Sequence, residues 1–366
     1  MSLDHYTIGK GKMLAKEKIS LKKVLKYDPE RTYIGKRYLD DKVTFSDVQF
    51  SLEGMVALHS NIFFEHSFLA QSPQGFHLSA MNVQSLVPYL CEQLATALLE
   101  TEKQSCKRFS ITSSKQQYQR FITEQEGLRC SVTLSQREGN NDRGYYGVDN
   151  PVEFLTFSYE FLTAASEKPS FLGTMSFAIE KEALLPTLSN PSNNFSTNTF
   201  TETATIPSYK ISIPNIFPQV QCDKRYTLKD VYVDKQNLAI EGTFVNKSND
   251  LAPIQIHGAA GLLMKGLFCH LFQIDRGKTL AARAYTISSQ YNGQAPKENN
   301  LLLKVQVERE IFCSEKGLER WGFFTCHYTL GEYVRSTLRI AAPLHDLTTK
   351  EEILLRIHFQ EITKKP

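Results

Sequence analysis

The chain has 366 residues, of which 41% are hydrophobic and 22% charged, a composition typical of a globular protein with room for two domains. Its net charge of +3 is small for this length and argues against a nucleic-acid-binding surface. No run approaches the ~18–20 apolar residues of a membrane span, and the first thirty residues lack the apolar segment of a signal peptide. We therefore expect a cytoplasmic protein that binds neither nucleic acid nor membrane.

The cysteines and histidines give no sign of a metal or a disulfide framework. The seven cysteines are dispersed without a C-x-x-C pair, which favours free thiols in a reducing compartment. The nine histidines show no metal-ligand spacing, and phosphate-cradling and dinucleotide-binding glycine motifs are absent. We predict neither a metal nor a cofactor.

The first half of the chain follows one pattern from residue 42 onward. Residues 1–41 are a polar extension that holds one short amphipathic helix, with Leu21, Val24 and Leu25 at helical spacing. Residues 42–63 contain two strand-like runs around a turn at Gly54. Residues 75–100 predict one long apolar helix, and strand-like runs follow at 108–114, 128–138, 153–163 and 170–179. We assign residues 42–186 to a first domain.

The pattern then begins again. Residues 187–224, rich in Ser, Thr, Asn and Pro, predict a linker or long loop. The run at 225–246 resembles that at 42–63, with Asp230 matching Asp47, and a second apolar helix spans about 254–274. Strand-like runs follow at 281–291, 301–311, 321–329, 333–341 and 353–362. Residues 225–366 therefore form a predicted second domain, and the chain an internal repeat.

A long apolar helix followed by antiparallel strands can be buried if the sheet curls around it, which is the arrangement of the hotdog fold. The expected class is α+β: a double hotdog with two antiparallel sheets, each wrapped around a long central helix. Gly258, Gly261 and Gly266 support close packing of the second helix, since glycines inside an isolated helix are unfavourable. The alternative is an ordinary α+β pair of domains.

One candidate for chemistry is His66. The segment Phe63-Phe-Glu-His66, followed by the long helix, resembles the entry to the central helix of hydroxyacyl-carrier-protein dehydratases. In those enzymes a His in this loop and an acid on the helix share an elimination. The acid is missing here, where Ser79 and its neighbours stand, so the other interpretation is an exposed His at a strand end.

His77 and His257 are a matched pair, because they occupy equivalent repeat positions at the starts of the two helices. A neutral imidazole there could act as a general base toward a hydroxyl nucleophile; alternatively, each His only hydrogen-bonds the backbone of its helix end. Lys265, alone on an apolar helix, could bind a phosphate or carboxylate, or extend to solvent. We take His77, His257 and His66 as catalytic candidates, and Ser79, Asn82 and Lys265 as substrate-binding candidates.

The segment 20–50, with Tyr33-Ile-Gly-Lys-Arg-Tyr38 and Asp47-Val48, and the helix opening His77-Leu-Ser79 are together similar to the Pseudomonas avirulence D protein family. The resemblance implies synthesis of a small signal or elicitor, by joining a β-ketoacyl group to a sugar-like hydroxyketone, in the manner of butyrolactone-signal synthases. Of the site residues, it carries over only His77 and Ser79. Pro88 and the linker depart from the pattern.

The leading hypothesis is therefore an acyltransferase of secondary metabolism that uses a fatty- or β-ketoacyl thioester. Its expected partners are an acyl-carrier protein or acyl-CoA as donor and a small-molecule acceptor, with a homodimer left open. Two alternatives stand beside it. One is a non-catalytic protein that binds an acyl ligand or a partner, and the other is a hydroxyacyl-thioester dehydratase.

Overall fold

The computed structural model describes residues 16–26, 42–52, 54–65, 80–119, 128–140, 152–163, 166–183, 226–246, 251, 253–272, 283–293, 296, 298–313 and 321–343. Within these ranges the predicted helices and most of the predicted strands are present. The predicted linker at 187–224 and the predicted strand at 353–362 lie outside the described residues.

Two long helices and many strands make up the described chain. The helices are α1 (Leu21–Leu25), α2 (Ala80–Thr101) and α3 (Pro253–Phe272). The strands of the first half are β2 (Lys42–Ser51), β3 (Ala57–Glu65), β4 (Gln104–Tyr118), β5 (Leu128–Asn140), β6 (Val152–Thr163) and β7 (Phe171–Ala183). The remaining strands are β1 (Glu17–Ile19), β8 (Tyr226–Asp234), β9 (Ala239–Asn246), β10 (Arg283–Tyr291), β11 (Asn300–Cys313), β12 (Trp321–Leu330) and β13 (Val334–Pro343).

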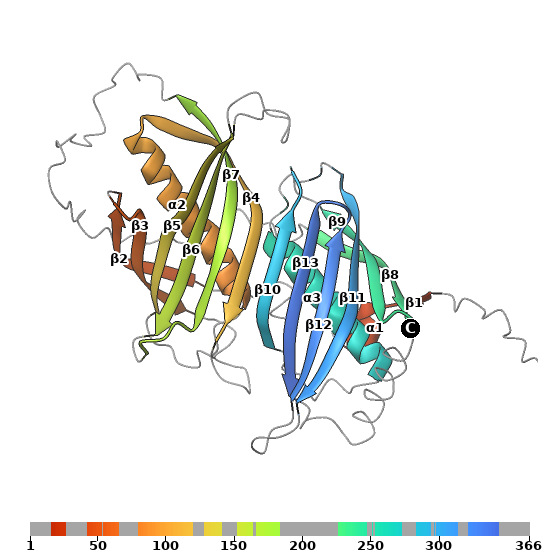
Figure 1. Cartoon of the computed structure of the whole chain (residues 1–366). Helices are drawn as coiled ribbons and strands as arrows, with labels where there is room; N and C mark the ends of the chain where they lie inside the picture. The colour runs from red at the N-terminus through yellow and green to blue at the C-terminus, as the bar shows by residue number, and fades with distance from the viewer. Residues whose placement is uncertain are drawn as a thin grey trace, which may run out of the picture.

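All of these strands belong to one antiparallel sheet, in the order β1-β8-β9-β11-β12-β13-β10-β4-β7-β6-β5-β3-β2. The halves of the chain join where β10 pairs with β4, from Thr286 opposite Gln117 to Gln290 opposite Ser113 (Figure 1). We call this junction the seam. The prediction of two separate sheets, each wrapped around its own helix, is wrong. Pairing at the seam satisfies backbone groups that two separate sheets would leave open along β4 and β10.

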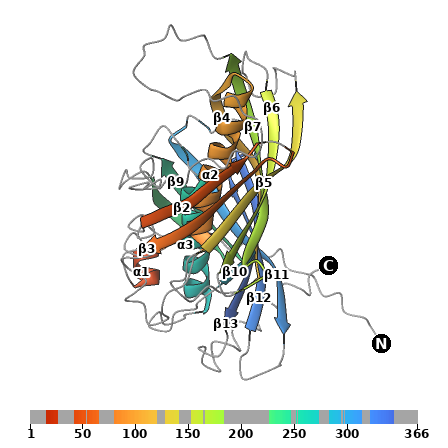
Figure 2. The ribbon, with the colours of Figure 1, turned by 90° about the vertical axis from the view of Figure 1, so that its left-hand side faces the viewer.

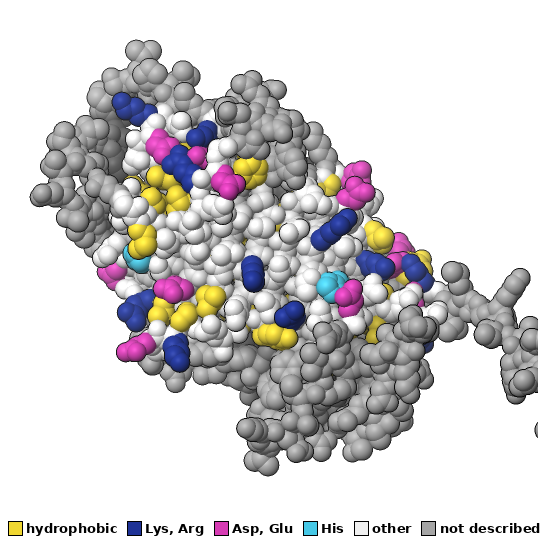
Figure 3. Space-filling model, in the orientation of Figure 1, with side chains coloured by type: hydrophobic (Ala, Val, Ile, Leu, Met, Phe, Trp, Pro, Cys, Tyr) yellow, Lys and Arg dark blue, Asp and Glu magenta, His cyan; other side chains and the backbone are white. Residues whose placement is uncertain are grey.

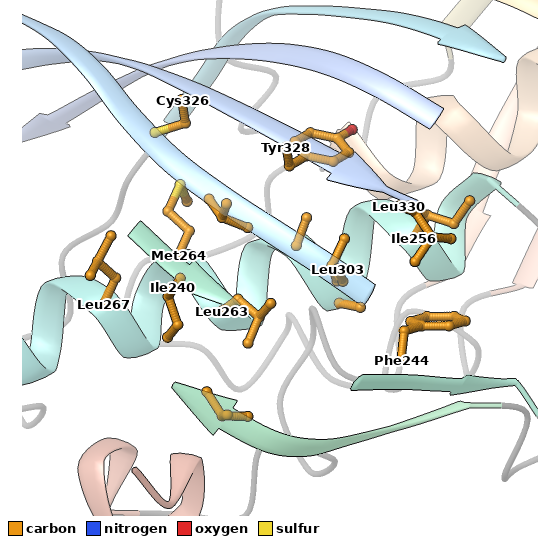
Figure 4. Close-up of a cluster of buried hydrophobic side chains, with 14 of the residues drawn as sticks. Ile240, Phe244, Ile256, Leu263, Met264, Leu267, Leu303, Cys326, Tyr328 and Leu330 are labelled. Carbon is orange, nitrogen blue, oxygen red and sulfur yellow. The ribbon is translucent and has the colours of Figure 1, made fainter. Parts of the chain in front are cut away.

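The two long helices lie on the same side of the sheet, and we call the opposite side the outer face (Figures 1 and 2). Helix α2 contacts β3, β4 and β5, whereas α3 contacts β8, β9 and β11, and the two helices contact each other. Each helix covers its own cluster of buried apolar side chains. In the cluster of the second half, Ile256 and Leu263 of α3 point toward Leu303 of β11 (Figure 4).

An irregularity shared by the halves supports the internal repeat. Asp47 in β2 and Asp230 in β8, which the sequence aligns, both have left-handed backbones, with φ of 52° and 45°. Each lies where its hairpin changes register, between Ser46 and Gln49 in one case and between Lys229 and Tyr232 in the other. Asp is one of the few residues that tolerate this conformation, so the same bulge is built twice.

The N-terminal segment 16–26 packs on the second half of the chain. Strand β1 extends the sheet beside β8, and α1 packs on α3. A Cβ at Gly266 of α3 would collide with the Leu21 side chain, so this glycine makes room for α1. Ion pairs join Lys16 to Glu241 at 2.5 Å and Lys18 to Asp230 at 2.7 Å. The closest neighbour of this helix glycine is therefore α1, rather than the sheet that we had expected.

Candidate functional site

A band of hydroxyl groups crosses the seam on the helix-facing side of the sheet. Ser114 of β4, Ser289 of β10, Ser336 of β13 and Tyr328 of β12 stand directly opposite one another in register, strand by strand. Residues paired in this way share a face of the sheet. The same row continues with apolar side chains on both flanks, namely Met175 and Phe157 in the first half and Val305 and Ile240 in the second. The middle of an apolar surface is thus polar.

These hydroxyls are buried and bonded to one another. The exposed fractions of Ser289, Ser336 and Ser114 are 1%, 4% and 6%. Ser336 donates to Ser289 over 2.8 Å, and both serines hydrogen-bond the Tyr328 phenol. Ser289 also hydrogen-bonds Tyr291, as does Ser114. Buried polar groups require such partners, and here the partners come from both sides of the seam.

His257 of α3 joins this band from the helix side. Pro253 begins the described helix, a position that proline favours because the first helical N–H groups have no partner within the helix. One turn later the partly buried His257 ring places Nδ1 against the Tyr328 hydroxyl and Nε2 3.2 Å from the Tyr291 hydroxyl. A neutral imidazole has one donor and one acceptor nitrogen, so both ring nitrogens are occupied.

Burial fixes the charge of this group. It lowers the pKa of His257 to about 3, because the charged imidazolium is disfavoured away from water. Burial also raises the pKa of the Tyr328 and Tyr291 phenols well above the usual value. Near pH 7 the cluster therefore consists of a neutral imidazole between two protonated phenols.

The first half of the chain adds further polar groups beside the seam. Gln116 of β4 is 2% exposed, accepts a hydrogen bond from the Tyr118 hydroxyl over 2.9 Å and bonds the Tyr159 phenol. Tyr118 lies close enough to Tyr328 for the two phenols to influence each other's ionisation. We call His257, Tyr291, Tyr328 and the three serines the seam cluster.

Among the predicted site residues, His257 is the one placed in this cluster. Lys265 lies on α3 about 12 Å further along the helix, at 1.5 Å per residue, and is partly buried, which lowers the pKa of its ammonium. It forms no ion pair with a described residue. His66, His77 and Ser79 lie outside the described residues, as does the side chain of Asn82 in α2. The pairing of His77 with His257 thus stays a prediction.

The chemistry near His257 differs from that of a His–acid pair. In the described part of the chain its two ring nitrogens bond tyrosines, and no described carboxylate contributes to its pKa shift. The described residues also contain no group of three His, Cys, Asp or Glu side chains that could hold a metal ion. Five of the cysteines are free thiols, as predicted: Cys91, Cys106, Cys130, Cys269 and Cys326.

Sequence reasoning missed the tyrosines and serines of the cluster, although a signal exists. Ser289 lies between Ile287 and Tyr291 at a spacing of two, so all three share one face of β10. A serine in phase with buried apolar residues indicates a buried hydroxyl that needs a partner. The partner strands, β4 and β13, could not be identified from the local pattern.

A buried acceptor on α2 is a second unusual feature. The Gln84 side chain is 5% exposed, and its Oε1 atom has no hydrogen-bond partner among the described residues. An unsatisfied buried carbonyl costs about 1–3 kcal/mol.

We expect Gln84→Leu to raise the free energy of unfolding by about 1 kcal/mol, measured by urea denaturation. A loss of stability of that size would show that the amide makes contacts that leucine cannot replace.

No family model matches the chain, and no curated protein does either. Solved structures with a similar course include an acyl-ACP thioesterase from Bacteroides thetaiotaomicron, with 10% identity, a TM-score of 0.38, and 78% of this chain and 97% of that chain covered. The 12:0-ACP thioesterase from Umbellularia californica gives 7% identity, a TM-score of 0.38, and 78% and 94% coverage. A protein with a hot dog fold from Alicyclobacillus acidocaldarius gives 9% identity and a TM-score of 0.38, with 80% of this chain and 95% of that chain covered. At such TM-scores these likenesses fix neither the fold nor the activity of the chain.

None of the helices in the described ranges is long and apolar enough to cross a membrane.

Proposed function

We propose that the chain is an acyltransferase that acts on acyl thioesters, with the seam cluster at its reacting centre. The observation that carries the proposal is the neutral His257 imidazole held between the Tyr328 and Tyr291 hydroxyls. Tyr328 stands in the middle of an otherwise apolar row of the sheet, and His257 lies near the start of a helix. An apolar surface suits an acyl chain, while a helix N-terminus and phenol donors suit a developing negative charge.

The reaction would proceed by attack of an acceptor hydroxyl on the thioester carbonyl carbon. A C–O bond forms, the C–S bond breaks, and the hydroxyl proton passes to the departing sulfur. An imidazole whose pKa is near 3 is a weak base by itself. It can carry that proton while negative charge develops beside it, once its acceptor nitrogen exchanges a tyrosine hydrogen bond for one from the acceptor hydroxyl. The tyrosine released in this exchange can then donate its hydrogen bond to the carbonyl oxygen.

The finer assignment rests on the resemblance to the avirulence D family. It names a β-ketoacyl thioester on an acyl-carrier protein or CoA as donor, and a sugar-like hydroxyketone as acceptor. The aligned bulges at Asp47 and Asp230 support the repeat that the resemblance includes. In that assignment His77 stays a second catalytic candidate.

The test is product analysis by mass spectrometry after incubation with acyl-carrier-protein or CoA thioesters and hydroxyketones. We expect His257→Ala and Tyr328→Phe each to lower the rate by at least about 100-fold. His327→Gln is the matched control, because His327 lies on the outer face beside Glu308 and Thr337. Circular dichroism checks that each variant is folded. Unchanged yield in folded His77→Ala and His257→Ala variants would refute the assignment.

A second candidate function is binding of an acyl ligand or partner without turnover. The observation in its favour is that both ring nitrogens of His257 are already bonded within the protein. Native mass spectrometry of the purified chain distinguishes the two functions. A retained acyl ligand that is never converted supports binding, whereas turnover of any thioester excludes it. A dehydratase has less support, because the described residues supply no acid beside His257.

A further inference from the structure

The outer face of the first half carries a hollow of about 550 Å³ that the helices and the seam cluster do not reach. One row of its lining runs across four strands: Thr133 of β5, Ser158 of β6, Thr174 of β7 and Lys115 of β4. Three of these four residues have short side chains that end in a hydroxyl, so the side chains in the middle of the row rise little above the sheet. Strands lie about 4.8 Å apart, and the row is therefore about 14 Å long, enough for a sugar ring with its substituents.

The neighbouring row carries longer side chains and forms a rim. It consists of Ser131 of β5, Glu160 of β6, Leu172 of β7 and Gln117 of β4, again in direct register. Adjacent rows on one face lie about 7 Å apart, since same-face residues are two positions apart along a strand. The hollow thus has a hydroxyl-lined floor beside a rim with one carboxylate, one amide and one apolar side chain.

At Gly173, beneath the hollow, the backbone lies very close to the neighbouring strand β4 and to the Tyr159 side chain. A Cβ on Gly173 would collide with the Lys115 carbonyl oxygen and with the Tyr159 side chain. Tyr159 reaches under this point from the helix-facing side, and its hydroxyl approaches the Lys115 carbonyl oxygen at 3.4 Å. Only glycine allows this approach, so the local shape of the sheet under the hollow is held by packing from the core.

The polar groups of the hollow are available to a ligand. Lys115 and Glu160 form no ion pair with any described residue, and the side chains of Gln117 and Ser158 have no hydrogen bond in the described part of the chain. Lys115 and Glu160 carry opposite charges, so the lining of the hollow has no net charge that would attract an ion. Charged side chains are also sparse across the middle of this face (Figure 3).

We propose that this hollow binds a neutral, polyhydroxylated sugar. Hydroxyl groups both donate and accept, and so do the Ser, Thr and Gln side chains that line the hollow. The Glu160 carboxylate can accept from two neighbouring sugar hydroxyls, and charge-assisted bonds of this kind are the strong ones. Leu172 supplies an apolar contact for the C–H face of the ring. The site lies on the other side of the sheet from the seam cluster and does not depend on the acyltransferase proposal.

The test is saturation-transfer NMR on the full chain with D-glucose, D-mannose and D-fructose as probes, and inorganic phosphate as the anionic comparison. We expect saturation transfer to at least one sugar. Ser158→Leu, which fills the floor, should abolish the transfer, and Glu160→Gln, a nearly isosteric change at an exposed position, should weaken binding about tenfold. Ser288→Leu is the matched control and should leave the signal unchanged, because Ser288 continues the same row one strand beyond Lys115.

Three outcomes would overturn the proposal. The first is no transfer to any of the sugars. The second is an equal signal from wild type and Ser158→Leu, which would place sugar binding elsewhere. The third is binding of phosphate alone with loss in Lys115→Met, which would make the hollow an anion site. The result is independent of thioester turnover, so failure here leaves the acyltransferase proposal standing, and the reverse also holds.

Discussion

Replacing Phe177 with alanine is expected to lower the free energy of unfolding by about 3–5 kcal/mol, the usual cost of emptying a buried phenylalanine position. Phe177 of β7 is fully buried. Its ring stacks on Phe109 with 4.1 Å between ring centroids and meets Phe157 edge-on at 5.9 Å. Its removal therefore leaves a cavity and breaks two aromatic contacts beneath α2.

Urea denaturation followed by circular dichroism measures this change. Phe63→Ala is the matched control, since the chemical change is the same but Phe63 is 48% exposed. We expect the control to change the unfolding free energy by less than about 1 kcal/mol. If Phe177→Ala cost no more than the control, Phe177 would not be packed against Phe109 and Phe157 in the core.

Acid is expected to destabilise the protein through His257. Its pKa is about 3 in the folded chain, against an ordinary value of 6.5. Between these values the unfolded state binds one more proton at this site than the folded state, so the unfolding free energy rises with pH. The slope is about 1.4 kcal/mol per pH unit for one proton. The contribution is complete above pH 6.5 and is lost as the pH falls toward 3.

The measurement is the unfolding free energy at several values between pH 6.5 and 4.5, over which His257 alone accounts for roughly 2–3 kcal/mol. Other groups titrate in this range, so the comparison is between variants. His257→Gln should reduce the slope by about 1.4 kcal/mol per unit relative to wild type. Identical slopes in wild type and His257→Gln would mean that the imidazole is not buried as a neutral group.

The elements that the sequence predicted are those with a strong local period. The apolar spacing of α2 and α3 and the alternation of β6 and β12 each depend on burial of one face, and this can be seen within a short window. The repeat was also visible, because the hairpins at Asp47 and Asp230 have similar residues and share the same bulge.

The continuous sheet was not predictable in the same way. The strand segments that form the seam, 113–117 and 286–290, are polar at every position except Ile287 and lie in different halves of the chain. Nothing in either segment specifies the other, and each could have been an open edge. Backbone hydrogen bonding joins them, and it carries no side-chain signal.

The candidate site was likewise only partly predictable. His257 was found because His77 repeats it. Its tyrosine partners come from β10 and β12, 34 and 71 residues further along the chain, and their meeting with His257 follows from the order of strands. Strand order is a property of the whole fold, so local spacing could not reveal it.

The attachment of residues 16–26 to the second half has a consequence for the way the chain is made. Lys18 and its partner Asp230 are 212 residues apart in sequence. A ribosome adding about 5–20 residues per second needs roughly 10–40 s to cover that distance. During that interval the nascent first half can form its core, while β1 has no β8 to pair with and α1 has no α3 to pack on. When β8 emerges, in contrast, β1 has already been made and can pair with it. This order of events protects the outer side of β8 from pairing with other nascent chains.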